Sequence, residues 1–198
     1  MQDVKLGETG GSIDIIDFGP FLDGTEKQAV ANAILDSFKK IGFVYLTNHG
    51  IPQTKIDQIF ARSKRFFELP IESKMKAPHP GTGNHPRGYS PPGAEKITQH
   101  LYDRADIAKA RAKPDVKENF ECGREDHPVL PNIWLPEGTL PGFKEACLEF
   151  FWQLQDDEVT RIGAHSDFGS ITLLLQDGVG GLEVEDPNTS GIFHVRDL

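Results

Sequence analysis

The stretch RIGAHSDFGSITLLLQDGVGGLEV, Arg161 to Val184, contains a histidine and an aspartate two positions apart beside a run of strand-forming residues. Successive side chains of a β-strand point to opposite faces, so His165 and Asp167 are expected on one face with Cα atoms roughly 6.5 Å apart. One small cation can contact both side chains at that separation. The sequence therefore predicts a metal-binding strand.

This pair of side chains indicates the kind of metal. Imidazole and carboxylate suit a divalent first-row ion, and two histidines with one carboxylate form the ligand set of non-haem Fe(II) oxygenases. A third protein ligand is therefore required. The His-x-Asp pattern alone is weak evidence, because 7 histidines and 16 aspartates among 198 residues give roughly 0.6 matches by chance. The rest of the chain has to supply the context.

Composition limits the class of protein. A chain of 198 residues can bury a sizeable core, most simply as one domain with at most a small satellite. Its net charge of -9 argues against nucleic acid or an anionic membrane as a partner. The first residues do not resemble a secretion signal, and no apolar run is long enough for a membrane span. We therefore expect a cytoplasmic protein with reduced, structural thiols at Cys122 and Cys147.

The first third of the chain is predicted to form strand, helix, strand, helix. The two strands are Ile13–Asp17 and Phe43–Thr47. The helix between them is expected to start with a capping box formed by Thr25 and Gln28, and to stop before Gly42.

A turn at Asn48–Gly50 leads into the second helix, whose first turn suits Pro52. The stretch Ala77–Ala94 is rich in proline and glycine, and we expect a long loop that cannot hold regular structure. Arg87 and Tyr89 lie in this loop as candidates for a pocket rim, although a surface position is the simpler interpretation.

The second half begins with a predicted strand, Lys117–Cys122, and an extended covering segment, Pro128–Pro141. Pro141 is expected to start a helix whose apolar face ends near Leu154. Further strands, suggesting an antiparallel meander, are predicted at Thr160–Asp167, Ser170–Gln176, Leu182–Glu185 and Ile192–Val195.

Seven segments, in this order along the chain, resemble one known family. They are IDIIDFGPF, GFVYLTNHGIP, FFELPIESK, RGYSPPGAE, ENFECGRED, NIWLPEGTLPGF and RIGAHSDFGSITLLLQDGVGGLEV. The family is that of the iron- and 2-oxoglutarate-dependent dioxygenases of the isopenicillin-N-synthase-like group. The first six segments are similar to its N-terminal region, and the last is similar to the metal-binding strand of its double-stranded β-helix core.

The resemblance implies a function for the His-x-Asp pair. His165 and Asp167 match two of the three iron ligands, while 2-oxoglutarate chelates the metal and dioxygen takes a remaining position. Oxidative decarboxylation of 2-oxoglutarate gives succinate and carbon dioxide and drives hydroxylation, desaturation or ring closure of a small molecule. Gly163 and Gly169 would allow a close approach of the backbone, although turn or packing roles explain them equally well.

The sequence departs from the family pattern in two places. The family has a further helical stretch and strands where this chain has only QDDEV between Leu154 and Thr160. The distal histidine and the Arg-x-Ser pair that grips 2-oxoglutarate are expected after Leu198, and Arg196–Leu198 is not that pair. The third iron ligand and the cofactor-binding residues are therefore not assigned.

The other histidines are weaker ligand candidates. His194 lies in a strand that the family places before the distal ligand, so packing or a surface position is the simpler interpretation. The rest are interpreted as turn or solvated residues: His49, His79, His85, His100 and His127.

Together these observations predict an α+β protein, with an N-terminal helix and strand region and a partial jelly-roll core that lacks its later strands. The expected regions are 1–125 (dioxygenase N-terminal region), 126–158 (covering segment and helix) and 159–198 (partial core). The expected function is that of an oxidoreductase, a dioxygenase of specialised metabolism. The alternative is a truncated, inactive binding module or splice product. Unpaired strand edges favour this alternative and predict self-association.

Overall fold

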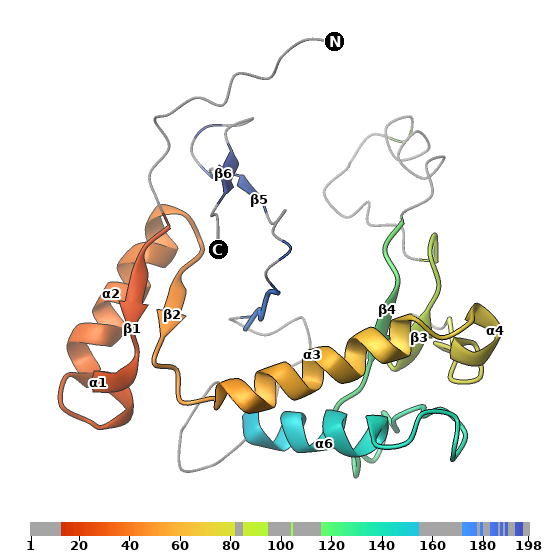
Figure 1. Ribbon diagram of the computed structural model, residues 1–198. Helices are drawn as coiled ribbons and strands as arrows, with labels where there is room; N and C mark the ends of the chain where they lie inside the picture. Colours follow the sequence, from red (N-terminus) through yellow and green to blue (C-terminus); the bar gives the residue numbers. More distant parts are fainter. Residues whose placement is uncertain are drawn as a thin grey trace. The chain divides into compact units, whose positions relative to one another are not determined.

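Figure 1 shows the computed structural model of the chain. It describes residues 13–81, 85–94, 104, 116–154, 172–177, 179, 183–185, 187, 189 and 193–195. The chain divides into two compact units, one formed by residues 1–53 with 157–198 and the other by residues 54–156.

The first unit opens with two parallel strands, β1 (Ile15–Asp17) and β2 (Tyr45–Thr47). The short helix α1 (Gly19–Leu22) and the longer α2 (Lys27–Lys40) connect them. Glycine favours a positive φ, and Gly42, at φ +82°, follows α2 where the sequence predicted its end. Strand, helix and strand are therefore confirmed here.

Two details of this region differ from the prediction. The capping box is wrong, because α2 follows Glu26 and the Thr25 hydroxyl donates to Asp23 Oδ1 at 2.6 Å instead. β2 starts at Tyr45 rather than Phe43 because the Phe43 carbonyl accepts a hydrogen bond from Ser37 Oγ at 2.8 Å. A nearby side chain therefore satisfies a backbone group that the prediction had assigned to the sheet.

The turn after β2 has the predicted chemistry. Asn48 and Gly50 both adopt a positive φ, +51° and +78°. The Asn48 side chain donates to Asp17 Oδ1 at 2.9 Å, and His49 Nδ1 accepts the N–H of Ile51 at 3.2 Å. His49 is thus a hydrogen-bonding turn residue, as predicted.

The second unit contains the helices α3 (Gln53–Phe67), α4 (Ile71–Lys74) and α6 (Phe143–Leu154). Helices α3 and α6 lie side by side (Figure 1), and the sequence predicted both of them. The antiparallel strands β3 (Gly88–Ser90) and β4 (Asn119–Glu121) complete this unit, and β4 lies within the predicted strand Lys117–Cys122.

The core of this unit is aromatic and is centred on Phe66 of α3, which is fully buried. Its ring stacks on Phe143 of α6 with centroids 4.7 Å apart. It also meets Phe120 of β4 at 4.8 Å and Tyr89 of β3 at 5.9 Å. Phe66 therefore joins both helices to the sheet, and burial of such rings dominates core energetics.

β3 corrects the prediction that Ala77–Ala94 cannot hold regular structure. Two backbone bonds to the preceding segment hold it, Tyr89 N–H to the Ala77 carbonyl at 2.7 Å and His79 N–H to the Tyr89 carbonyl at 2.9 Å. Gly88 has φ +97°, and a Cβ there would lie 2.9 Å from the Ala77 carbonyl oxygen. Gly88 contributed to the prediction of a loop, but its missing side chain is what allows β3 to lie so close to the segment at Ala77.

The C-terminal part contains two short antiparallel strands, β5 (Glu183–Glu185) and β6 (Phe193–Val195). Both were predicted. The predicted strand Ser170–Gln176 is wrong for residues 172–176, which form no ladder and expose Leu173 and Leu174. The predicted strand Thr160–Asp167 lies outside the described residues. Among the helices that the structure describes, none is long and apolar enough to cross a membrane.

Candidate functional site

The predicted iron ligands, His165 and Asp167, lie outside the described residues, as do Gly163 and Gly169. Within the described ranges, no three His, Cys, Asp or Glu side chains gather as metal ligands. His194 lies in β6, where its backbone pairs with Val184.

The described residues place an arginine at the end of the β3–β4 ladder. Gly88 pairs with Glu121, so Arg87 lies across from Cys122 when the register is continued by one residue. The Arg87 guanidinium also reaches Gly123, because a Cβ built on that glycine would lie 2.8 Å from Nη1 and closer still to Nη2. The arginine therefore fills the space that a side chain at position 123 would take.

Two nitrogen atoms beside this ladder are buried without a hydrogen-bond partner. They are Nδ1 of His85 and Nε of Arg87, and both residues are half-buried. The prediction that His85 is solvated is therefore wrong. The surface interpretation also fails for Tyr89, which is only 1% exposed. Buried polar atoms usually have partners, so we expect a water molecule or another small polar group beside each of these two nitrogens.

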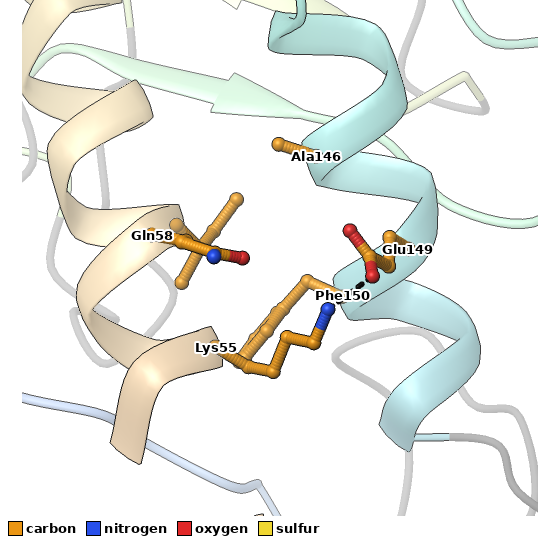
Figure 2. A pocket seen from close by; sticks show the side chains of 6 residues that line it. Lys55, Gln58, Ala146, Glu149 and Phe150 are labelled. Atoms are coloured by element: carbon orange, nitrogen blue, oxygen red, sulfur yellow. Dashed lines mark hydrogen bonds and ion pairs between the residues drawn. The ribbon is translucent and has the colours of Figure 1, made fainter. Parts of the chain in front are cut away.

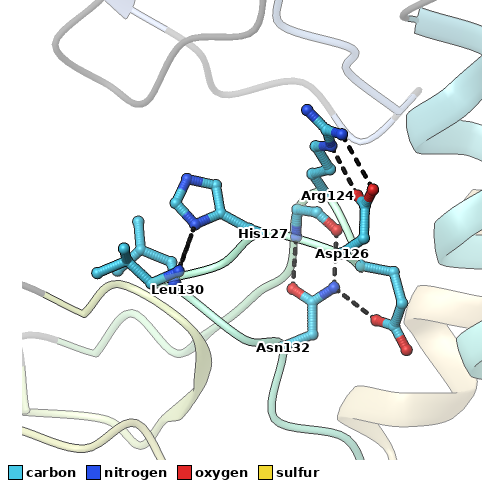
Figure 3. A network of polar contacts seen from close by, with 8 residues as sticks. Arg124, Asp126, His127, Leu130 and Asn132 are labelled. Carbon is cyan, nitrogen blue, oxygen red and sulfur yellow. Dashed lines mark hydrogen bonds and ion pairs between the residues drawn. The ribbon is translucent and has the colours of Figure 1, made fainter.

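Gly123 is held by the side chain of Asn132 (Figure 3). The Gly123 N–H donates to Asn132 Oδ1 at 2.8 Å, and Asn132 Nδ2 donates to the Gly123 carbonyl at 2.7 Å. The amide thus pairs with the backbone as a neighbouring strand would. Asn132 Nδ2 also donates to Glu125 Oε2 at 2.8 Å, which fixes the orientation of the amide.

Glu125 is the centre of a group of polar contacts next to Gly123 and Asn132. It accepts hydrogen bonds from Trp134 Nε1 at 2.9 Å and Asn132, and it forms an ion pair with Lys144 at 2.5 Å. Burial alone would raise the pKa of Glu125, but these hydrogen bonds and the Lys144 charge lower it overall. Glu125 is therefore ionised and already neutralised by Lys144.

The outer part of the same loop carries an exposed ion pair. Arg124 donates twice to the carboxylate of Asp126, at 2.6 and 2.9 Å (Figure 3). His127 Nδ1 accepts the N–H groups of Val129 and Leu130. His127 was predicted to be solvated, but its ring nitrogen closes this turn.

A second polar network joins α4, β3 and the start of β4. Lys74, only 6% exposed, donates to Glu118 Oε2 at 2.7 Å and to the Phe67 carbonyl at 2.9 Å. The Tyr89 hydroxyl donates to the same Glu118 oxygen at 2.5 Å. Burial works to raise the pKa of Glu118, but the hydrogen bonds from Lys74 and Tyr89 and the Lys74 charge lower it overall.

The two cysteines, Cys122 and Cys147, are free, as predicted. A hydrogen bond from the Cys147 thiol lowers the pKa of Cys122, burial opposes this, and the Arg87 charge lowers the pKa further. The same hydrogen bond and burial raise the pKa of Cys147. Arg87 therefore lies close enough to the Cys122 sulfur to act on it electrostatically.

A small hollow lies between α3 and α6 (Figure 2). Its lining consists of Lys55, Gln58, Ile59, Ala146, Glu149 and Phe150. Lys55 and Glu149 form an ion pair across it. The two charges neutralise each other across the hollow.

Residues 13–137 match the sequence family described as the N-terminal region of the non-haem dioxygenase in morphine synthesis. This chain belongs to the non-haem dioxygenase family. The proline hydroxylase buaE of Petromyces alliaceus is 34% identical over 228 aligned residues, which cover 91% of this chain and 69% of that dioxygenase. The 2-oxoglutarate-dependent dioxygenase gloF of Glarea lozoyensis is 32% identical, and the alignment covers 92% of this chain and 70% of gloF.

Solved structures of one Neurospora crassa protein have the same fold. The full-length protein in complex with alpha-KG and thymine gives a TM-score of 0.58 at 44% identity. That match covers 74% of this chain and only 45% of the Neurospora crassa chain. The C-terminally truncated form of the same protein, in the apo state, gives a TM-score of 0.70 at 33% identity, over 98% of this chain and 81% of that one.

These matches confirm the predicted resemblance to the dioxygenase family. Its 2-oxoglutarate-dependent members are oxidoreductases that use Fe(II), 2-oxoglutarate and dioxygen, and alpha-KG is bound in the Neurospora crassa complexes. The mixture of helices and strands agrees with the predicted fold class, since the structural neighbours are 2-oxoglutarate oxygenases.

Two residues around Arg87, Gly123 and Asn132, were not predicted. Gly123 was read only as part of a family segment, because one glycine carries no local signal of what it makes room for. Asn132 was missed for the same reason. The signal that could have found them is the pairing of RGYS with NFEC, and that pairing is a long-range contact.

Proposed function

We propose that this chain is an Fe(II)- and 2-oxoglutarate-dependent oxygenase that hydroxylates, desaturates or cyclises a small molecule. The observation that carries the proposal is the presence of His165-x-Asp167 in a chain whose residues 13–137 match the dioxygenase N-terminal region. The relatives support a small-molecule substrate, since one is named a proline hydroxylase and the Neurospora crassa protein was crystallised with thymine.

In this proposal His165 and Asp167 hold Fe(II) as two of its protein ligands. The donor set fits, because a neutral imidazole and a carboxylate are common ligands of non-haem Fe(II). When bound, the iron supplies the oxidising chemistry together with dioxygen and 2-oxoglutarate. The protein's own contribution is to orient the substrate and to exclude water from the reacting groups.

The test is succinate formation by the purified chain supplied with Fe(II), ascorbate and 2-oxoglutarate. We expect succinate from the natural sequence and none from His165→Ala. His127→Ala is the matched control, because its imidazole closes an exposed turn. Absence of succinate from the natural chain, despite Fe(II) binding by equilibrium dialysis, would contradict the proposed activity.

A shortened internal segment is part of this proposal. The alignment with the proline hydroxylase spans 228 positions, more than the 198 residues of this chain, so the relative has residues where this chain has none. We place this gap at QDDEV, between Leu154 and Thr160, because the family resemblance leads us to expect a further helical stretch and strands there. The partial jelly-roll core and the boundaries at residues 125 and 158 stay predictions.

Such a core would leave strand edges unpaired, and we propose that the chain self-associates through them. The support is that β5 and β6, among the strands the structure describes, pair only with each other. Light scattering after size exclusion measures the mass. An oligomer whose mass falls on dilution supports edge pairing, whereas a monomer at all concentrations contradicts it.

A further inference from the structure

The two thiols of this chain lie at neighbouring positions in the aromatic core of the second unit. Phe120 of β4 and Phe143 of α6 have ring centroids 5.2 Å apart. Cys122 comes two residues after Phe120, and Cys147 comes one helical turn after Phe143. Each cysteine therefore shares a face of its element with the phenylalanine before it, because the side-chain period is two in a strand and 3.6 in a helix. The cysteines are the next pair of facing side chains between the two elements.

The two thiols are in direct contact. The side chains of Cys122 and Cys147 share a hydrogen bond, and both residues pack in the cluster that contains Phe66. A disulfide requires Cβ atoms about 3.5–4.5 Å apart and sulfur atoms that are turned toward each other. Sulfur atoms that share a hydrogen bond already face each other. Joining them therefore requires side-chain rotations rather than a rearrangement of β4 or α6.

The backbone on both sides of this pair is held in place. Asn132 bonds to the N–H and the carbonyl of Gly123, next to Cys122, at 2.8 and 2.7 Å. One turn before Cys147, the ring of Phe143 stacks on Phe66 with centroids 4.7 Å apart. The denatured chain has to close a long loop to bring the same thiols together. The folded chain therefore favours the disulfide more strongly than the denatured chain does.

The two sulfur atoms differ in access. Cys147 is only 8% exposed, whereas Cys122 is half-buried, so a small oxidant reaches Cys122 first. The thiolate is the form that attacks an oxidant. The hydrogen bond from Cys147 and the Arg87 charge lower the pKa of Cys122 overall, against burial and two nearby glutamates. Cys122 is thus the attacking thiol, and Cys147 is the thiol that completes the reaction.

We propose that Cys122 and Cys147 are a redox-sensitive pair, which a hydroperoxide converts into an intramolecular disulfide. The Cys122 thiolate attacks one peroxide oxygen and becomes a sulfenic acid, while the O–O bond breaks and the other oxygen leaves and takes up a proton. The Cys147 sulfur then attacks the Cys122 sulfur. The S–S bond forms, the S–O bond breaks, and the hydroxide leaves with the Cys147 proton as water. Two thiols are oxidised to one disulfide, and hydrogen peroxide is reduced to two molecules of water.

The disulfide joins the end of β4 to α6 and closes a loop that contains the covering segment Pro128–Pro141. Trp134 of this segment already packs against the same elements, with its ring centroid 5.8 Å from Phe120 and 6.5 Å from Phe143. A cross-link restricts the denatured chain, so oxidation is expected to stabilise the second unit. This site lies within residues 54–156 and does not depend on the proposed function.

The test uses the full chain, reduced, freed of reductant and treated with hydrogen peroxide without added iron. Because the chain has 2 cysteines, the expected product is a monomer without free thiols whose mass has fallen by about 2 Da. Proteolytic mapping without reductant should yield one linked pair of peptides, containing Cys122 and Cys147. The thermal midpoint should rise on oxidation, and dithiothreitol should restore both thiols and the original midpoint.

Two variants separate the roles of the thiols. In Cys147→Ser, the Cys122 sulfenic acid has no partner and should accumulate as an adduct with dimedone. In Cys122→Ser, the buried Cys147 thiol should react with peroxide at least about tenfold more slowly than Cys122 does in Cys147→Ser. Circular dichroism establishes that each variant is folded. Mapping of the natural chain does not depend on either variant.

An equilibrium measurement shows whether the fold itself brings the thiols together. In glutathione redox buffers, the equilibrium constant for disulfide formation should be at least about tenfold larger in the folded chain than in urea. Equal constants would overturn the proposal. So would two free thiols after peroxide treatment, a covalent dimer as the product, or a thermal midpoint that falls on oxidation.

Discussion

At the scale of single residues, Glu118 is the acceptor that two buried donors share. Lys74 and Tyr89 both bond to its Oε2 atom, and the Lys74 ammonium also lies 5.3 Å from the centroid of the Tyr89 ring. The carboxylate therefore compensates a cation that is almost completely removed from water. Removing that negative charge leaves the Lys74 ammonium buried without an anion. An uncompensated buried charge is the main cause of the loss of stability when a buried ion pair is broken.

We expect Glu118→Gln to lower the free energy of unfolding by about 2 kcal/mol, less than the roughly 3–5 kcal/mol of a fully buried pair, because the Glu118 side chain is 27% exposed. Chemical denaturation measures the change. Glu149→Gln is the matched control, since Glu149 pairs with Lys55 but is 57% exposed, and it should cost less than about 1 kcal/mol. Equal effects would contradict the role given to burial.

The same carboxylate predicts a dependence of stability on pH. Folding lowers the pKa of Glu118 below its ordinary value of 4.5, so its contribution is complete above that value and is lost as the pH falls below it. Thermal midpoints measured from pH 6 down to pH 3 should therefore fall less steeply in Glu118→Gln than in the natural chain. Parallel curves would argue against this assignment.

The residue-scale site was only partly predictable. The family segment RGYSPPGAE drew attention to Arg87 and Tyr89, but the simpler interpretation placed both on the surface. Exposure of these side chains depends on β4, which lies far along the chain, and on the segment at Ala77 that covers Gly88. No local sequence pattern identifies segments that pack against a residue from far along the chain. The prediction of His165 and Asp167 needs only strand alternation, which is local, and it stays a prediction.

At the scale of elements, β3 depends on one glycine. Gly88→Ala adds a Cβ to a residue at φ +97° and places it 2.9 Å from two backbone carbonyl oxygens. We expect a loss of at least about 2 kcal/mol in the free energy of unfolding. Gly138→Ala is the control, because Gly138 also has a positive φ, +80°, but has nothing within 4 Å of the added atom. It should lose about 1 kcal/mol.

The packing of α3 against α6 gives a second element-scale prediction. Phe66→Ala removes the ring that joins α3 to Phe143, Phe120 and Tyr89, and should lower the free energy of unfolding by about 3–5 kcal/mol. Phe43→Ala is the matched control, because Phe43 is 46% exposed. Denaturant titration of both variants measures the difference, and similar losses would contradict a core centred on Phe66.

Helices were the most predictable elements, and short strands the least. The apolar stripes of α3 and α6 repeat over several turns, so their periodicity is visible without a partner. β3 has only three residues, surrounded by proline and glycine, and its hydrogen bonds run to segments outside the motif. The capping box failed because Asp23 competes for the Thr25 hydroxyl, a choice that the pattern alone cannot make.

At the scale of the whole molecule, ligand binding should stabilise the folded chain. A ligand present at about 100 times its Kd adds about 2.7 kcal/mol to the free energy of unfolding. Under anaerobic conditions, Fe(II) with 2-oxoglutarate should therefore raise the thermal midpoint of the natural chain. Asp167→Ala should abolish this rise, whereas Asp126→Ala should retain it because Asp126 lies in an exposed ion pair. If Asp167→Ala retained the rise in thermal midpoint, the assignment of Asp167 as a metal ligand would be contradicted.

The hydrogen bond between Tyr89 and Glu118 also predicts how the stability of the protein depends on pH under alkaline conditions. Burial, followed by this hydrogen bond, raises the pKa of the Tyr89 phenol, so the native state excludes the phenolate. The stabilisation from the neutral phenol is complete below about pH 10 and is lost as the pH rises beyond that. Tyrosinate absorbance from Tyr89 should consequently emerge in the same step as the loss of native circular dichroism, which makes this phenol an optical reporter of global unfolding.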